Sequence, residues 1–172
     1  YATFASNEDM YAKLKSGAVN YDVIIPSDYM IEQLIAEDML EELDFNNIPN
    51  FSYIAEDYKV GEYDPDGLYS VPYTYGMVGI IYNSSIVNGT PDSWKLMWDE
   101  TYSGQILNFN NPRDAFGVAM YKLGIDVNTT EKVLWEAALG SLKEQKPLIQ
   151  AYVMDEIFNK MKNGSAAIAP YY

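Results

Sequence analysis

The sequence contains no cysteine and no histidine. It therefore offers no thiolate or imidazole ligand to a metal, no disulfide, and neither Cys–His nor Ser–His catalysis. Phosphate-binding loops, dinucleotide fingerprints and nucleophile elbows are absent as well. We expect no metal site and no cofactor. An enzyme would have to work with carboxylates, tyrosines and lysines alone, so we expect none.

Long apolar runs and basic residues are also scarce. No stretch of about eighteen apolar residues occurs, so the sequence predicts no transmembrane helix. Lysine and arginine number 11 against 25 acidic residues, which gives a net charge of −14. Phosphates would be repelled, so nucleic acid is a poor partner. A cationic ligand is compatible with this charge, and so is an ordinary solvated acidic surface.

Tyrosine is abundant, with 16 residues in a chain of 172. Its ring has a flat apolar face and a polar tip, which suits a recognition surface. The chain starts in the middle of a pattern at Tyr1, shows no signal peptide, and stops directly after an apolar run at Tyr172. We therefore expect a piece of a longer protein that lacks both ends.

Helix and strand patterns alternate along the chain, which predicts a mixed α/β architecture with parallel strands. In the first part, Ser6 and Ser27 are expected to cap two helices, and residues 21–26 and 40–43 are expected to form strands. In the second part we expect strands over 104–109 and 165–169 and helices over 93–98, 111–124, 130–145 and 154–162.

An extended segment, Leu68–Asn83, separates these two parts. Gly76 and Gly79 interrupt it, and residues 78–82 favour a strand. A single extended crossing with glycines is typical of a hinge between two lobes. We therefore expect residues 1–75 to belong to a first α/β lobe and residues 76–172 to a second, with the crossing at about 68–83.

Ligands of open α/β sheets bind where a strand ends and a helix begins. Two such points are marked, Ser27 with Tyr29 and Asn111 with Asp114, and the pair Tyr171–Tyr172 follows a strand-like run. Asp114 at a fixed helix end is suited to pair with an ammonium, and tyrosine faces suit methylenes or a cation–π contact. The alternatives are ordinary helix caps for the first two points and a buried aromatic pair for the third.

Four motifs in this order and spacing resemble the spermidine/putrescine-binding proteins of bacterial ABC importers. They are Tyr21–Tyr29 (YDVIIPSDY), Tyr69–Gly76 (YSVPYTYG), Ser93–Trp98 (SWKLMW) and Asn111–Phe116 (NPRDAF). The resemblance covers nearly the whole chain. It implies a two-lobed, periplasmic-binding-protein-like (type II) fold, here a fragment lacking both ends, in which a cleft closes on a polyamine.

The resemblance also implies residue roles and partners. The family's ligand-binding serine and aromatic residue match Ser27 and Tyr29, and its acidic pair matches Asn111 and Asp114. Asn111 stands where the family often has aspartate, which puts the preference between diamine and triamine in doubt. The family's stacking tryptophan falls at Tyr171 or Tyr172. Such proteins are monomers on the outer, periplasmic or extracellular, side of the membrane, free or lipid-anchored as lipoproteins, and they deliver cargo to a permease.

Three other interpretations remain open. In the first, the same fold binds a different small solute, such as a sugar, thiamine or a metal complex. A carboxylate-dependent enzyme on this fold is a further alternative. The last is a structural fragment that binds nothing because its partner segments are missing.

Overall fold

The computed structural model describes residues 1–172, which divide into two compact units, Tyr1–Tyr75 and Gly76–Tyr172. The architecture is mixed α/β, as predicted. None of the helices combines the length and the apolar character that a membrane span requires.

The first unit is built from helices. Its elements are α1 (Asn7–Lys15), α2 (Asp28–Ala36), the 3-10 helices η1 (Phe45–Asn47) and η2 (Pro49–Tyr53), and α3 (Glu56–Lys59). The hydroxyl of Ser6 caps α1 by accepting from the Asp9 amide at 3.1 Å, as its sequence predicts. Met10, Met30 and Leu34 form the buried core in which α1 and α2 meet.

The two strands expected in this unit do not form. Residues 21–26 and 40–43 are extended or bent but belong to no strand, and the side chains of Val23 and Ile25 are 80% and 60% exposed. A strand needs a neighbour that completes its backbone hydrogen bonds. The only β pairing among residues 1–75 is an isolated bridge between Gly61 and Asp64, so these apolar runs have no partner strand.

A buried carboxylate organises the end of the first unit. Asp64 is 2% exposed and accepts hydrogen bonds from the amides of Leu68 and Tyr69 and from the Ser70 hydroxyl, at 3.1, 3.0 and 2.8 Å. These bonds satisfy both carboxylate oxygens, which a buried charge requires. They fix the turn that precedes the extended segment.

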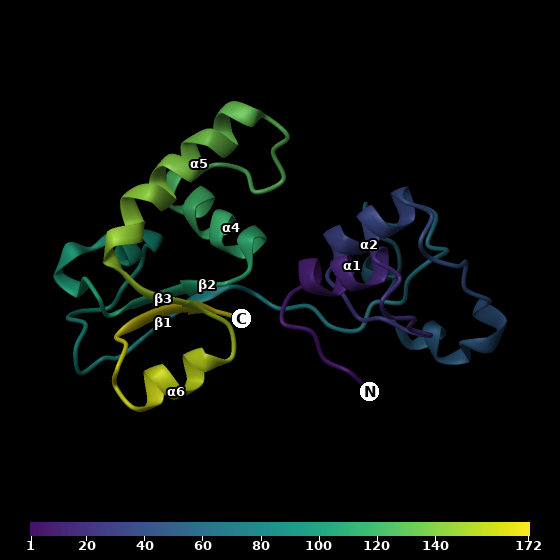
Figure 1. The fold of residues 1–172 in the computed structure, drawn as a ribbon, viewed down its shortest axis with the longest axis horizontal. Coiled ribbons are helices and arrows are strands. Elements are labelled where there is room, and N and C mark those ends of the chain that lie inside the picture. The colour runs from purple at the N-terminus through teal and green to yellow at the C-terminus, as the bar shows by residue number, and fades with distance from the viewer. The chain divides into compact units, whose positions relative to one another are not determined.

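The second unit contains a four-stranded sheet in the order β1-β4-β2-β3 (Figure 1). Strand β2 runs parallel to β3 and β4, and β1 pairs antiparallel with β4. The strands are β1 (Gly79–Tyr82), β2 (Ile106–Phe109), β3 (Ile149–Val153) and β4 (Ile168–Tyr171). The helices are η3 (Trp94–Trp98), η4 (Glu100–Tyr102), α4 (Pro112–Leu123), α5 (Lys132–Gln145), η5 (Lys146–Leu148) and α6 (Glu156–Lys162).

Helices cover both faces of this sheet. In Figure 1, α4 and α5 lie on one face and α6 on the other. Every residue of β2 is buried, because the strand is central and covered on both sides. Val118 of α4 packs in the core on one face, and Ile157 of α6 packs with Leu107 on the other.

The sequence pattern did not predict strand β3, and it predicted the start of strand β4 too early in the chain. Residues 149–153 read IQAYV, with a polar residue and a tyrosine in a short run, and they form a strand because β2 supplies a parallel partner. Strand β4 begins at Ile168, three residues after the predicted start at Ser165, and extends to Tyr171. Pro170 is tolerated within it, although proline donates no backbone hydrogen bond.

A buried amide network ties helix α5 to the sheet. Gln145 is fully buried; its Oε1 accepts from Asn108 Nδ2 at 2.8 Å, and its Nε2 donates to the Met97 carbonyl at 3.0 Å. Asn108 lies in β2 and its Oδ1 accepts from the Phe109 amide. The network therefore joins α5, β2 and η3 through fully paired polar groups.

Replacing Gln145 with leucine should lower the free energy of unfolding of the second unit by about 2–4 kcal/mol, because two buried polar groups would lose their partner. The chain's three tryptophans, Trp94, Trp98 and Trp135, all lie in this unit, so urea unfolding followed by tryptophan fluorescence measures it. The neighbouring exposed residue supplies the control, since Glu144→Leu should change little. Equal stability of Gln145→Leu and the wild type would contradict the network's role.

Candidate ligand-binding site

Two parallel strands of the second unit end at the same edge of the sheet. Strands β2 and β4 are paired in parallel at Ile106 and Ile168, so their carboxyl ends point the same way. The segment after β2 holds Asn111 and starts α4, and Tyr172 directly follows β4. Polar and aromatic residues from distant parts of the sequence therefore meet at this edge.

Asp114 and Tyr172 contact each other at this edge of the sheet. The Tyr172 hydroxyl donates a hydrogen bond to Oδ2 of Asp114, across 58 residues of sequence. Asp114 lies in the first turn of α4, where the helix dipole and unpaired amides favour a negative charge. The structure thus holds a carboxylate in place and sets an aromatic ring beside it.

Aromatic rings continue from this carboxylate. Tyr172 packs against Phe109 with ring centroids 5.3 Å apart and against Tyr171 at 5.5 Å. Tyr171 meets Phe158 edge to face at 4.9 Å, and its hydroxyl donates to Asp155 at 3.2 Å. Burial is the larger cause, and the hydrogen bond to Asp155 the smaller one, that raise the pKa of Tyr171 above its usual value. This phenol is therefore neutral near pH 7.

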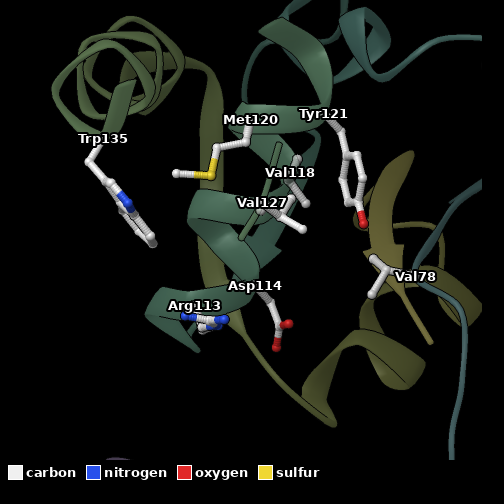
Figure 2. A pocket seen from close by; sticks show the side chains of 9 residues that line it. Val78, Arg113, Asp114, Val118, Met120, Tyr121, Val127 and Trp135 are labelled. Atoms are coloured by element: carbon white, nitrogen blue, oxygen red, sulfur yellow. The ribbon is translucent and has the colours of Figure 1, made fainter. Parts of the chain in front are cut away.

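A pocket of about 140 Å³ lies along α4 next to Asp114. Asp114, Gly117, Val118 and Tyr121 recur at helical spacing, which places them on neighbouring parts of one helix face. Figure 2 shows Val78 and Tyr121 on one side of α4 and Arg113 and Trp135 on the other, with Asp114 between them. The full lining is Val78, Arg113, Asp114, Gly117, Val118, Met120, Tyr121, Val127 and Trp135.

Asn111 serves as the cap of α4. It is 8% exposed, and its Oδ1 accepts from the Arg113 amide at 3.0 Å. Pro112 occupies the first helical position, and Gly124 ends the helix with φ of 69°. Asn111 therefore has a structural role and brings no charge to this edge.

The first unit holds the other two predicted residues. Ser27 was expected to cap α2 with its side chain, but it makes no such bond. Its Oγ instead accepts from Asn7 Nδ2 at 3.0 Å, because the start of α1 lies against this loop. The Tyr29 hydroxyl accepts from the same amide group at 3.0 Å and donates to Glu8 Oε1 at 2.9 Å.

The six predicted residues thus fall into two groups, Ser27 with Tyr29 in the first unit and Asn111, Asp114, Tyr171 and Tyr172 in the second. Sequence reasoning missed Asn7 and Glu8, which it treated only as the start of a helix. It also missed Tyr121, although a position seven residues after Asp114 lies on the same helix face. No group of three or more acidic side chains is placed to hold a metal ion.

The sequence pattern of the bacterial extracellular solute-binding proteins matches residues 19–172. A curated relative, the spermidine/putrescine-binding periplasmic protein of Escherichia coli K12, is 36% identical over 168 residues. That alignment covers 95% of this chain and 48% of the relative, so the chain spans about half the length of the relatives it matches.

Solved structures show the same fold. The spermidine/putrescine ABC transporter substrate-binding protein PotD from Streptococcus pneumoniae is similar with a TM-score of 0.75 and 35% identity, over 99% of this chain and 53% of that one. The TpPotD lipoprotein of Treponema pallidum is similar with a TM-score of 0.88 and 30% identity, over 98% of this chain and 54% of that one. The chain therefore has the fold of periplasmic binding proteins over about half of their length.

Removing the Asn111 cap should destabilise the second unit without unfolding it. Asn111→Ala should lower its free energy of unfolding by about 1 kcal/mol, because the amide of Arg113 loses its acceptor. Tryptophan fluorescence during urea unfolding measures the change. Asn111→Asp is the matched control: aspartate caps a helix as well as asparagine does, so its stability should stay close to that of the wild type. A loss shared by both variants would contradict the cap as the cause.

Proposed function

Because the chain belongs to the family of bacterial extracellular solute-binding proteins, we propose that it binds a polyamine, putrescine or spermidine, as part of the solute-binding component of an ABC importer. The observation that carries this proposal is the Asp114 carboxylate at the start of α4, which accepts a hydrogen bond from Tyr172, whose ring in turn packs against Tyr171. The similar proteins of E. coli and S. pneumoniae, at 36% and 35% identity, are a spermidine/putrescine-binding protein and the substrate-binding protein of a spermidine/putrescine transporter, which supports the same ligand class for this chain.

The chemistry of a polyamine fits these groups. Each ammonium carries a positive charge and several N–H donors, and a carboxylate attracts the charge and accepts hydrogen bonds from the donors. The methylenes between the ammonium groups need flat apolar walls. Asp114 offers the acceptor, and the neighbouring tyrosines offer the walls. The net charge of −14 adds a long-range attraction that speeds the encounter with a cation.

We propose that the two compact units are parts of the two lobes of the full binding protein, joined through residues 68–83. We propose Ser27 and Tyr29 in the first unit, and Asn111, Asp114, Tyr171 and Tyr172 in the second, as ligand-binding residues. Glycines at 76 and 79 fit a segment that changes its backbone angles when lobes close.

The proposal includes the setting of the whole protein. It places the protein on the periplasmic or extracellular side of the membrane, as a monomer that hands its cargo to permease subunits. A lipid anchor is one way to hold it there, and the similar T. pallidum protein is a lipoprotein. We infer a transport rather than a catalytic role, because the relatives' names describe solute binding and the chain has no histidine or cysteine.

The role of Asp114 is tested by Asp114→Asn. Putrescine affinity, measured by calorimetric titration, should fall by about 1–3 kcal/mol, because the neutral amide keeps the size of the side chain but loses the charge. Asp92→Asn removes the same charge from an exposed position in the same unit and should leave the affinity unchanged. Equal affinity of Asp114→Asn and Asp92→Asn would remove Asp114 from the site.

A second substitution tests which polyamine is preferred. Asn111→Asp should keep the helix cap and add a carboxylate three residues from Asp114. Spermidine has one more ammonium than putrescine, so its affinity should rise more, by about tenfold relative to putrescine. Competition titration with the two amines measures the ratio. A ratio equal to that of the wild type would show that position 111 does not set the preference.

A further inference from the structure

A buried amide in the first unit organises the start of α2, where Ser27 and Tyr29 lie. Asn7, the first residue of α1, is 7% exposed. Its Oδ1 accepts from the Ser27 amide at 3.2 Å, and its Nδ2 donates to both the Ser27 hydroxyl and the Tyr29 hydroxyl at 3.0 Å. One side chain therefore holds three groups at the start of α2, about 20 residues further along the sequence.

The orientation of this amide follows from its partners. A backbone N–H can only donate, so the Asn7 atom that faces the Ser27 amide must be the carbonyl oxygen. The other atom is then the NH₂ group, whose two hydrogens point to Ser27 Oγ and to the Tyr29 oxygen. Both hydroxyl oxygens are thereby acceptors toward Asn7.

The Tyr29 proton is directed to the next residue of α1. Its hydroxyl donates to Glu8 Oε1 at 2.9 Å, and the second oxygen, Oε2, is buried with no hydrogen-bond partner in the protein. A phenol has one proton, so a Tyr29 that donates to Glu8 presents only acceptor character to any other group. The Glu8 carboxylate also places a negative charge directly behind this hydroxyl.

We propose that Asn7 and Glu8 are positioning residues that make the Tyr29 hydroxyl a hydrogen-bond acceptor and so select ligands that donate, such as an alkylammonium. This inference rests on the proposed polyamine function and deepens it. An ammonium has only donors to offer, and donation of the phenol proton to the Glu8 carboxylate strengthens the phenol oxygen as an acceptor, whereas a ligand that presents a lone pair to Tyr29 meets repulsion. The selectivity lies in the start of α1, which carries none of the predicted contact residues.

A double-mutant cycle between Glu8 and Tyr29 tests the proposal. Glu8→Met removes the acceptor and its charge but keeps an unbranched side chain, and it should weaken putrescine binding about tenfold. Glu8→Gln retains an oxygen that can accept the Tyr29 proton and should recover part of the loss. Glu32→Met removes the same charge from an exposed position on α2 and should leave the affinity unchanged. Each variant's stability is measured separately by urea unfolding.

In a Tyr29→Phe background the hydroxyl is absent, so Glu8→Met should change putrescine affinity by less than about twofold. A tenfold loss in both backgrounds, with a wild type that binds putrescine, would overturn the inference and leave the proposed function intact. Failure of the wild type to bind any polyamine would instead remove the proposed function. The two failures are therefore distinguishable in one set of titrations, performed on the intact protein that carries this chain.

Discussion

The parallel pairing of β2 with β4 is the constraint on which the candidate site of the second unit depends. Because both strands run the same way, the helix start after β2 and the aromatic end of β4 lie at one edge of the sheet. The contact between Asp114 and Tyr172 follows from this register. The buried hydrogen bond between Asn108 and Gln145 ties this central strand, β2, to helix α5.

The sequence predicts those elements whose signals are local. The helix start at α4 and the start of α1 are predicted correctly, and so is a strand that ends at Phe109, although it begins at Ile106 and not at Gly104. Each of these depends on residues within one turn or one strand. The strand expected at 21–26 fails and β3 is missed for the same reason: strand formation is decided by a partner elsewhere in the chain. Val23 and Ile25 have strand propensity but no neighbour, whereas residues 149–153 have a neighbour.

The candidate site shows the same limit. Asp114 and Tyr172 each stand out as candidates, but their contact spans 58 residues and only the sheet register reveals it. Asn7 and Glu8 carry the signature of a helix start and nothing more, because their partners Ser27 and Tyr29 lie about 20 residues away. Residues that position a site are thus harder to find from sequence than residues that line it.

The central claim, polyamine binding, is tested most directly by calorimetric titration of the wild-type chain, and of the full-length protein where the natural protein extends beyond it, with putrescine and spermidine. A neutral sugar and thiamine serve as comparison ligands. The account predicts saturable binding of at least one polyamine and no comparable binding of the sugar or thiamine. Binding of a comparison ligand with both polyamines inert, in either form of the protein, would contradict it.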